Sequence, residues 1–547
     1  MPDPIDPAAG SKVALAGRVV TMDGNSTVHD RGVLYIDAGK IVDARPANEA
    51  PPDGFDGVSK VDVGGTIYPG LIELHNHLAY NALQLWQVPK QYENRDDWGG
   101  AKNPDYRRLI SGPMRLIGPD PDLMPAVVRY VECKALIGGT TTSQGIELFS
   151  NKAARRYYRG NIRNVEQTDD PDLPGAGAKI GDVQAGSAQS FLNTIKTRSC
   201  YILHLSEGTN DAAREHFLAL RLGGDEWALF KSLAGIHAVG LDADDFPILA
   251  RFETSMVWSP LSNLLLYGET AKVKAAKKAK VKIGIGSDWS PSGSKNLLGE
   301  LKVARLASEA EGALFSDEQI VAMATRTAAE ILKWDKELGS LEPGKRPDLL
   351  VVNGDDGDPH EHLLKATERD VALVVVAGRP RYGKRSLVER LGGEGLEDVT
   401  IGGRKRVLNL KQTTADPAVG KISLAQATDR LRDALQNLKQ LALDAERRGT
   451  PLHRMLAASE ADEVVWGLAL DELEPTGVEL RPRAPVPGGT APTGPSLTEA
   501  KAKPLSEIVG PLELDRLTVV DDPDWLDAID KQGNLPEWVA PGLRKLY

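Results

Sequence analysis

Thr66-Ile-Tyr-Pro-Gly-Leu-Ile-Glu-Leu-His-Asn-His77 is an apolar run that ends in two histidines one residue apart. The run predicts a buried strand, and side chains two residues apart in a strand point to the same side. The imidazoles of His75 and His77 can therefore reach one metal ion at the C-terminal end of this strand. A His-x-His pair alone is weak evidence for a metal site, so the hypothesis depends on ligands from later strand ends.

Beyond this stretch, apolar strand runs alternate with longer helical stretches, which is typical of βα units. The recognisable strand ends lie at 74–77, 139–144, 162–166, 201–204, 235–239, 256–259 and 283–288. One more strand is needed for a complete barrel, and it must lie between Asp170 and Gly186, in a segment rich in Gly, Asp and Pro. Enzymes built on such barrels place their chemistry at the C-terminal ends of the strands.

Short strand candidates flank this region on both sides, at 12–15, 18–22, 32–37, 40–44 and 61–63, and again at 349–352, 371–377 and 407–410. We therefore predict an α/β fold in which a (β/α)8 TIM-like barrel (67–335) is inserted in a small β-sandwich. Residues 1–66 and 336–410 are its two halves. A helix over 317–332, N-capped by Ser316, is expected to close the barrel region.

Residues 411–547 are predicted to form a mainly helical extension that contains a Pro/Gly linker at 481–496. Ser423 is placed to cap a helix that Gly449 ends. One face of this helix carries Leu424, Leu431, Leu435, Leu438 and Ala442. Such a face is typical of a docking or dimer contact, so a homo-oligomer is possible. We expect the extension to be dispensable for the metal site.

The composition, with 41% hydrophobic and 26% charged residues over 547 positions, is that of a soluble globular enzyme of two or three domains. A net charge of −11 argues against nucleic acid as a partner. The sequence contains no apolar run long enough to cross a membrane and no secretory signal. Cys133 and Cys200 make no disulfide framework, which predicts a cytoplasmic location.

Two later strand ends supply the missing ligands. His204 ends Tyr201-Ile-Leu-His, and Asp288 ends Ile283-Gly-Ile-Gly-Ser-Asp. Together with His75 and His77 they offer three imidazole nitrogens and one carboxylate, a set that suits zinc or iron(II). A metal held in this way lowers the pKa of its water.

Two further residues fit the same end of the barrel. Glu207 lies three positions after His204 and is placed to shuttle a proton from metal-bound water, although it could also be an acid at the start of a helix over 208–220. His237 ends the next strand. It could be a fifth ligand, a group that polarises the reacting carbon of the substrate, or a histidine satisfied within the core.

The order of several motifs resembles that of the metal-dependent amidohydrolase superfamily, over roughly residues 10–385. These motifs are Pro69-Gly-Leu-Ile-Glu-Leu-His-Asn-His, Gly139-Thr-Thr-Thr, His204-Leu-Ser-Glu, His237-Ala-Val, Ser259-Pro-Leu-Ser-Asn, Gly286-Ser-Asp and Leu338-Gly-Ser-Leu-Glu-Pro-Gly-Lys-Arg-Pro-Asp. The resemblance is closest to the cytosine deaminase and triazine hydrolase branch. It implies one metal bound by His75, His77, His204 and Asp288, with Glu207 and His237 acting on the water and the substrate.

Two further features of the sequence have to be weighed beside this site: a second His-x-His pair and a group of aromatic residues. His360-Glu-His362 has the spacing of the metal pair, but it follows an acidic turn rather than a strand, so we expect an exposed loop. The loop over 78–118 carries Trp86, Tyr92, Trp98 and Tyr106 among its aromatic residues. Trp86 and Trp289 are candidates to bind a flat substrate, and packing of the loop explains such aromatics nearly as well.

The sequence thus predicts a metal-dependent hydrolase of a non-peptide carbon–nitrogen bond with a small-molecule substrate. Deamination of a nitrogen heterocycle by metal-bound hydroxide, on one Zn²⁺ or alternatively Fe²⁺, is the leading hypothesis. Hydrolysis of a cyclic amide, an amide or a carbamate on the same metal is the alternative. A non-catalytic barrel scaffold with a partner-binding extension is a second one.

Overall fold

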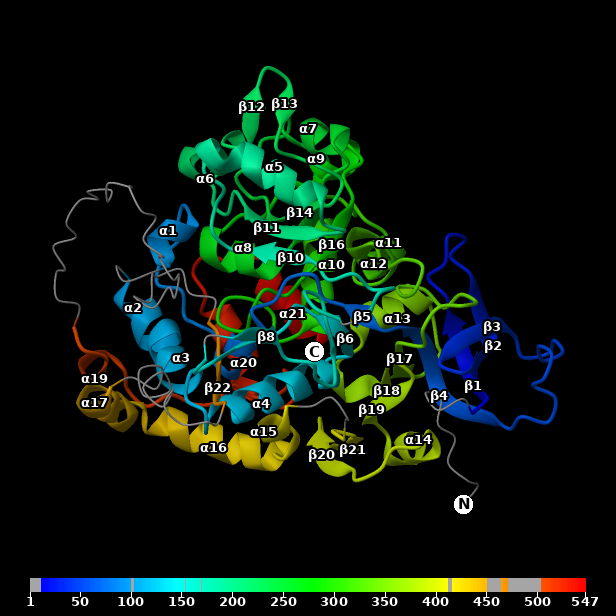
Figure 1. Cartoon of the computed structure of the whole chain (residues 1–547). Helices are drawn as coiled ribbons and strands as arrows, with labels where there is room; N and C mark the ends of the chain where they lie inside the picture. Colours follow the sequence, from blue (N-terminus) through cyan, green and yellow to red (C-terminus); the bar gives the residue numbers. More distant parts are fainter. Residues whose placement is uncertain are drawn as a thin grey trace.

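A computed structural model describes residues 11–99, 103–152, 154–168, 170–411, 416–449, 464–470 and 503–547 (Figure 1). The predicted linker at 481–496 lies outside these residues.

A nine-stranded sheet joins the two flanks of the chain, in the order β20-β21-β19-β18-β17-β4-β1-β2-β3. Its strands are β1 (Val13–Val20), β2 (Val28–Asp37), β3 (Lys40–Pro46), β4 (Lys60–Pro69), β17 (Leu349–Asn353), β18 (Val371–Val376), β19 (Arg379–Gly383), β20 (Glu397–Ile401) and β21 (Arg404–Leu408). The flanks meet where β17 pairs antiparallel with β4. The prediction that both flanks build one β-structure is confirmed, whereas its division into a sandwich stays a prediction.

The region between the flanks contains two parallel sheets, whose strands follow each other in chain order. One consists of β5 (Leu71–Ile72), β6 (Thr140–Ser143) and β9 (Arg163–Asn164), and the other of β10 (Gly177–Lys179), β11 (Tyr201–Leu205), β14 (Leu233–His237), β15 (Ser255–Trp258) and β16 (Ile283–Ile285). Single backbone hydrogen bonds continue from one sheet to the other, from Ala176 to Val165 (2.9 Å) and from Leu74 to Ile285 (3.2 Å). Strand β10 lies in the interval where the missing strand was expected.

The opening stretch is not one strand. Ile67 belongs to β4 of the nine-stranded sheet, whereas Leu71 and Ile72 form β5 of the parallel sheet. Pro69 ends β4 because it has no N–H to donate, and Gly70 packs so closely on Thr141 that a Cβ would lie 2.4 Å from its side chain. The chain therefore passes from one sheet to the other at Pro69-Gly70.

Helices follow the parallel strands along the chain, and the last two of those named next lie between strands of the nine-stranded sheet. They are α1 (Arg95–Trp98), α2 (Pro104–Tyr106), α3 (Gly112–Ile117), α4 (Met124–Ile137), α5 (Ala188–Lys196), α6 (Asp211–Leu218), α7 (Phe246–Arg251), α8 (Pro260–Tyr267), α9 (Val273–Lys278), α10 (Leu297–Ala310), α11 (Asp317–Met323), α12 (Arg326–Leu332), α13 (Pro359–Lys365) and α14 (Arg385–Arg390). The short strands β7 (Glu147–Ser150), β8 (Arg155–Tyr157) and β22 (Trp466–Leu468) form a separate sheet, and β12 (Arg221–Gly223) pairs with β13 (Glu226–Trp227).

Other sequence predictions of local structure were also wrong. The single helix over 317–332 is divided into α11 and α12, because Thr325 leaves the helical region with φ −132° and ψ −102°, although Ser316 does cap α11. His360 and His362 lie in α13 rather than in an exposed loop, and His360 is buried. Asp358 caps this helix, so the acidic turn before it is a helix start.

The C-terminal extension packs on the barrel. Helix α16 (Leu424–Gln436), capped by Ser423, lies on α4, and Arg129 of α4 donates to the carbonyl oxygens of Ile422 and Val419. Its leucine face is thus used within the chain. Helix α17 (Leu438–Arg448) follows it, so the single helix predicted from Ser423 to Gly449 was wrong: Asn437, with φ −108° and ψ 21°, divides it into two. The extension also contains α15 (Pro417–Gly420), α19 (Leu505–Ile508), α20 (Pro523–Asp530) and α21 (Val539–Leu546).

Residues 503–547, here called the tail segment, return to the centre of the molecule, where Figure 1 shows α20 and α21 beside the parallel strands. Helix α21 packs on α10. The side chain of Gln532 accepts from the backbone N–H of Val88 (3.1 Å) and donates to the carbonyl oxygen of Trp86 (3.0 Å). The tail segment therefore holds part of the loop that follows the first barrel strand.

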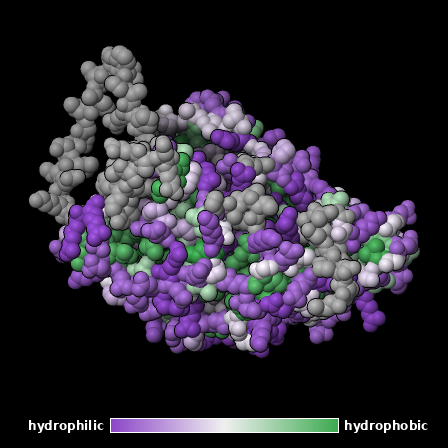
Figure 2. Space-filling view, turned by 60° about the horizontal axis from the view of Figure 1, so that its bottom comes forward, coloured by the Kyte–Doolittle hydropathy of each residue, from purple (hydrophilic) through white to green (hydrophobic). Residues whose placement is uncertain are grey.

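The face seen in Figure 2 carries mostly polar side chains, with separate apolar patches between them. No helix in the described parts of the chain has the length and apolar character needed to cross a membrane.

Glu300 of α10 anchors α8, the helix that follows β15. Its side chain is fully buried, and its Oε1 accepts from the backbone N–H of Leu261 at 2.9 Å. Burial raises the pKa of Glu300 to about 8. The carboxyl group is therefore protonated in the folded protein at neutral pH and ionised in the unfolded chain.

This difference predicts a pH-dependent stability. Between about 4.5 and about 8 the folded state holds a proton that the unfolded chain releases, so the free energy of unfolding falls as the pH rises. Glu300→Gln keeps the shape and removes the ionisation, and its stability relative to the natural protein should rise by about 1 kcal/mol or more across this window. Urea unfolding at pH 5 and pH 8 measures the change. The exposed Glu309→Gln on the same helix is the control, and an equal difference at both pH values would contradict the prediction.

Candidate metal centre

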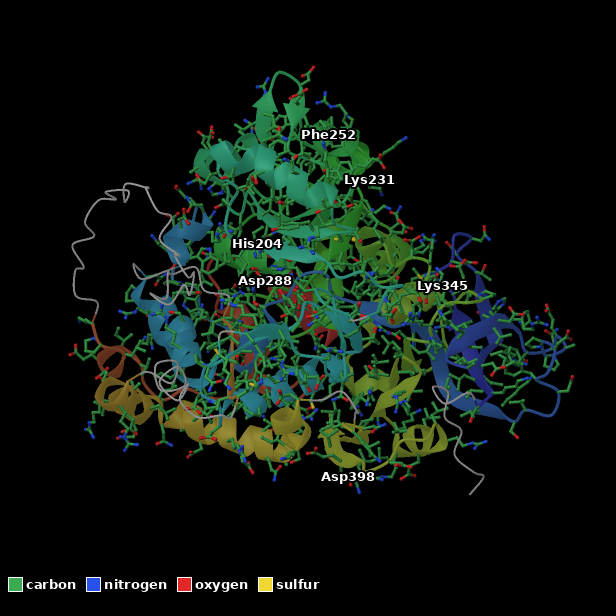
Figure 3. The ribbon with its side chains drawn as sticks, viewed as in Figure 1. His204, Lys231, Phe252, Asp288, Lys345 and Asp398 are labelled. Carbon is green, nitrogen blue, oxygen red and sulfur yellow. The ribbon has the colours of Figure 1, made fainter. Side chains whose placement is uncertain are left out.

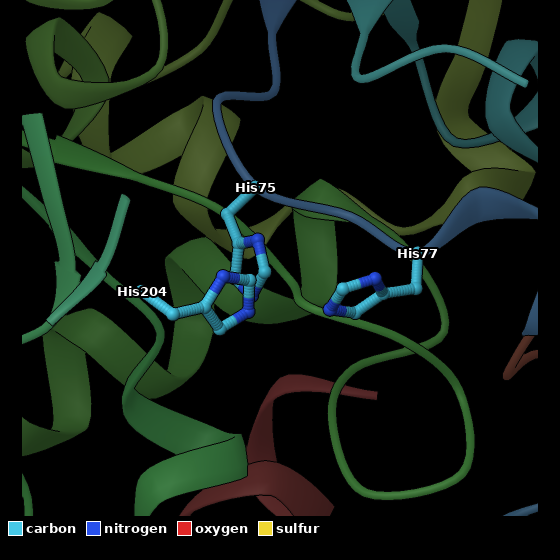
Figure 4. Close-up of side chains that lie close together, drawn as sticks. All are labelled: His75, His77 and His204. Carbon is cyan, nitrogen blue, oxygen red and sulfur yellow. The ribbon is translucent and has the colours of Figure 1, made fainter. Parts of the chain in front are cut away.

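The predicted ligands converge at the C-terminal ends of the parallel strands. Figure 3 shows His204 and Asp288 close together in the interior, and Figure 4 shows the rings of His75, His77 and His204 gathered at one point. Asp288 Oδ1 lies 3.1 Å from His75 Nε2 and 3.6 Å from His77 Nε2. His75, His77 and His204 offer ligand atoms within 4.8 Å of one another, and so do His75, His237 and Asp288.

A short parallel bridge holds the two ends of the ligand set together. Asn76, between the two histidines, pairs with Asp288, and the backbone N–H of Asp288 donates to the carbonyl oxygen of His75 at 3.0 Å. Gly286 makes this approach possible, because a Cβ at that position would lie 2.5 Å from the backbone N and O of His75. The close approach of the two backbones therefore requires glycine at the first position of Gly286-Ser-Asp.

Neighbouring side chains fix how the ligands are turned. His75 Nδ1 lies 3.1 Å from Gln144 Oε1, which also accepts from the backbone N–H of Asn76 at 2.9 Å. Because that oxygen is an acceptor, Nδ1 of His75 carries the proton and Nε2 is left with its lone pair. Ser262 donates to Asp288 Oδ2 at 2.6 Å, which leaves Oδ1 directed at the histidines.

The centre suits a divalent cation. Asp288, His75 and His204 are all buried, and among the described side chains His75 Nε2 and His204 Nδ1 are buried atoms without a hydrogen-bond partner. Buried polar atoms are nearly always paired, so such atoms indicate a missing partner. Burial lowers the pKa of His204, and the other histidines lower it further, which keeps its ring neutral as a ligand.

Asp288 is ionised in spite of its burial. Burial would raise its pKa, but the adjacent histidines, His75 above all, outweigh that effect and bring the pKa well below its usual range. Three imidazoles and one carboxylate are the donors that zinc and iron(II) prefer. The residues present therefore fit the predicted metal.

The backbone is strained where these residues stand. Ser206, His237 and Asp288 have φ values of 50°, 65° and 65°, in the left-handed region that costs energy for residues with a side chain. Each follows or ends a parallel strand. The strain turns their side chains at the strand ends, and such strain is typical of functional sites.

Glu207 follows strand β11 and lies close to His204 and His237. Its Oε1 accepts from the Tyr267 hydroxyl at 2.9 Å, and its Oε2 lies 3.6 Å from Arg95 and 3.7 Å from His237 Nε2. Glu207 does not cap the following helix, since α6 starts at Asp211 and Asn210 caps it. The helix-cap alternative is therefore wrong.

His237 has one nitrogen engaged and one directed at Glu207. Its Nδ1 lies 2.9 Å from Asn263 Oδ1, and Asn263 Nδ2 lies 3.4 Å from the Thr270 hydroxyl. Burial lowers the pKa of His237, so its ring is neutral and Nε2 keeps its lone pair. The histidine is hydrogen-bonded on one side only and is not a fully satisfied core residue.

A cavity of about 330 Å³, counted with the solvent at its entrance, opens onto these residues. Its lining combines the candidate site with aromatic side chains: His77, Arg95, Trp98, Tyr106, Ile180, His204, Glu207, His237, Asp288 and Trp289. Trp289 lies there as predicted. Trp86 does not line this cavity, because it is buried beside Tyr92 with ring centroids 6.0 Å apart.

Sequence reasoning missed Arg95, Tyr267 and Gln144. Gln144 stands at a recognised strand end and could have been found in that way. Arg95 and Tyr267 lie in a loop helix and at the end of α8, where no pattern in the sequence marks them.

The comparisons with known proteins agree with this geometry. Residues 212–381 match the Amidohydrolase family. A 5-methylthioadenosine/S-adenosylhomocysteine deaminase from Symbiobacterium thermophilum is 27% identical over 414 residues, which cover 67% of this chain and 92% of that protein. Both similarities support the resemblance of this chain to the amidohydrolase superfamily.

Solved structures are similar to this chain in fold. An adenosine deaminase from Xanthomonas campestris with bound zinc has a TM-score of 0.50 and 16% identity, covering 79% of this chain and 100% of that one. A triazine hydrolase variant has a TM-score of 0.52 and 19% identity, covering 77% and 99%. These neighbours imply that the fold of this chain is of the TIM-barrel type.

Removal of one ligand should remove the metal. His204→Ala leaves an incomplete set of donors around the ion, and an open site of this kind tolerates no missing ligand. We expect the purified variant to lose both metal and activity, as measured by elemental analysis and by turnover. His362→Ala is the matched control, because its histidine lies outside the metal-binding clusters found among the described residues. Full metal content in folded His204→Ala would contradict the assignment.

Proposed function

We propose that this protein is a hydrolytic deaminase of an amino-substituted nitrogen heterocycle. The observation that carries the proposal is the meeting of three functions in one cavity: a metal-binding cluster, an acid–base pair and a lining of flat aromatic rings. The deaminase named among its relatives supports the same chemistry.

We propose one zinc ion, held by His75, His77, His204 and Asp288, with Fe²⁺ as the alternative. The zinc bound to the structural neighbour from Xanthomonas campestris supports this choice. When bound, a zinc ion acts as a Lewis acid and makes water a nucleophile near neutral pH.

Glu207 is the proton carrier in this proposal. Its Oε1 is occupied by the Tyr267 hydroxyl, so Oε2 is the oxygen left to take a proton from the attacking water and to pass it to the leaving amine. The indole N–H of Trp98 donates to the Tyr267 hydroxyl at 2.8 Å. Because an indole is only a donor, the tyrosine must use its own proton toward Glu207.

His237 orients the reactants from the opposite side of Glu207. With Nδ1 engaged by Asn263, its Nε2, 3.7 Å from Glu207 Oε2, is left to accept a hydrogen bond from a substrate group in the cavity. Asp288 combines two roles as a metal ligand and as the anion that His75 and His77 face.

The substrate is proposed to be a flat aminopurine or a similar ring. Trp98, Tyr106 and Trp289 line the cavity, and their rings form one cluster with centroid separations of 5.7 Å for Trp98–Tyr106 and 6.0 Å for Trp98–Trp289. Aromatic faces bind flat rings by stacking. The relative from Symbiobacterium thermophilum is named for substrates that contain adenine.

The proposed cellular location remains the cytoplasm. Both cysteines are free and buried, which suits a reducing compartment. Assembly of several copies stays a prediction.

A substrate screen tests the proposed function directly. The metal-loaded protein is incubated with adenosine, 5-methylthioadenosine, guanine and amino-substituted triazines, and released ammonia is measured. We expect at least one amino-heterocycle to be deaminated, and a set of lactams and amides serves as the comparison. Ring opening or amide hydrolysis without ammonia release from any heterocycle would contradict deamination.

Glu207→Gln should abolish most of the turnover without removing the metal. The amide keeps the size of the side chain but cannot take a proton, and acid–base help is typically worth about 10² to 10⁴ in rate. We therefore expect kcat to fall by at least about 100-fold at unchanged metal content. Glu215→Gln, on the exposed side of α6, is the control. Normal turnover of Glu207→Gln would remove Glu207 from the mechanism.

Trp289→Leu should weaken substrate binding more than it affects stability. Loss of the stacking surface is expected to raise KM several-fold, whereas Trp86→Leu, which removes buried loop packing, should mainly lower the melting temperature. Steady-state kinetics and thermal unfolding of both variants separate the two effects. A larger KM change at Trp86 would restore Trp86 as a substrate residue.

A further inference from the structure

A buried cluster of charges joins the tail segment to the barrel. Asp515 uses one carboxylate oxygen for the ammonium group of Lys134 and the other for that of Lys295. All three side chains are 1% exposed. Asp522 pairs with Lys295 as well, at 2.9 Å, so the cluster contains two positive and two negative groups.

Lys134 connects Asp515 to the segments that follow the proposed metal ligands His77 and Asp288. Besides Asp515, its ammonium group donates to the carbonyl oxygen of Asn81 at 2.9 Å and to the Ser290 hydroxyl at 2.8 Å. An ammonium group has three donors, so all of them are used. The two acceptors come from the segments that directly follow His77 and Asp288.

Asn81 completes the connection. Its Oδ1 accepts from the backbone N–H of Ser290 at 2.8 Å, and its Nδ2 donates to Asn76 Oδ1 at 3.1 Å. Asn76 stands between His75 and His77 and forms the bridge to Asp288. The backbone N–H of Asp515 also donates to the carbonyl oxygen of Ala82 at 3.0 Å.

We propose that Asp515 is a positioning residue for the metal centre, acting through Lys134 to set the spacing between the His75–His77 pair and Asp288. Removing Asp515 leaves Asp522 as the partner of Lys295 but takes away the carboxylate that pairs with Lys134, and an uncompensated charge in a dry interior is far more costly than a solvated one. Lys134 would then have to move or lose its proton, and Asn81 and Ser290 would lose their common donor. The extension would on this account be part of the site, contrary to the expectation that it is dispensable for the metal.

Zinc affinity of the folded full-length chain is the test. The dissociation constant for zinc is measured by competition with a chromophoric chelator, together with the melting temperature of the metal-free protein. Partners beyond the ligands typically change metal affinity by about 10- to 100-fold. We expect both Asp515→Asn and Lys134→Met to weaken zinc binding by about tenfold. The double variant should be little weaker than either single one, because both act on the same contact.

Asp522→Asn is the matched control, since Asp522 belongs to the same segment and pairs with Lys295. It should lower the melting temperature of the metal-free protein and leave zinc affinity close to that of the natural chain. If Asp515→Asn does not fold, Lys134→Met decides, because Asp515 still pairs with Lys295 in that variant. Zinc affinity unchanged in Lys134→Met would overturn the proposal, and so would an equal loss in Asp522→Asn. The inference rests on the proposed metal site, and failure of the natural chain to bind zinc would overturn both.

Discussion

The Asp288 carboxylate is buried among imidazole rings, and much of the molecule serves to keep it there. A charge in a dry interior is tolerated only when opposite or polar groups surround it. Ser262 donates to one of its oxygens, while His75 and His77 face the other. These groups come from two distant parts of the sequence, which the fold brings to one edge of the parallel strands. A cation at this point would satisfy the carboxylate together with His75 Nε2 and His204 Nδ1, which have no hydrogen-bond partner among the described residues.

The need to surround buried charges with polar groups also explains the different roles of the residues around the cavity. The proposed metal ligands are themselves held by buried amides and hydroxyls, as His75 is held by Gln144 and Asp288 by Ser262. Glu207 is different, because its partners are a tyrosine and an arginine that leave one oxygen facing His237. This carboxylate lies close to His204 and His237, and the proposed role of Glu207 is to carry protons beside the metal. The aromatic side chains that line the cavity then limit which substrate rings can reach Glu207.

The candidate metal ligands could be recognised in the sequence more easily than the local structure around them. His75, His77, His204 and Asp288 were recognisable because each ends an apolar strand, and parallel strand ends meet at one edge. Patterns of this kind fail where tertiary structure decides. The opening stretch was counted as one strand because apolar periodicity does not reveal that Pro69-Gly70 passes from one sheet to another. His360 and His362 were expected in a loop because a short helix with an Asp cap has too few residues to show a period.

Long-range partners were beyond such reasoning. Arg95, Tyr267 and Asp515 are polar residues in ordinary surroundings of the sequence, and only the folded chain shows that they are buried against the site. The extension beyond residue 411 was treated as separate because its composition differs from that of the barrel. Its buried contacts with Arg129, Lys134 and Val88 show instead that it completes the core.

Anomalous diffraction at the zinc absorption edge, on crystals of the zinc-loaded chain, tests the central claim most directly. The account predicts one strong peak per chain, at about 2.0–2.2 Å from nitrogens of His75, His77 and His204 and from an oxygen of Asp288. A peak at the His360–His362 pair with none at the barrel end, or two peaks among the predicted ligands, would contradict it.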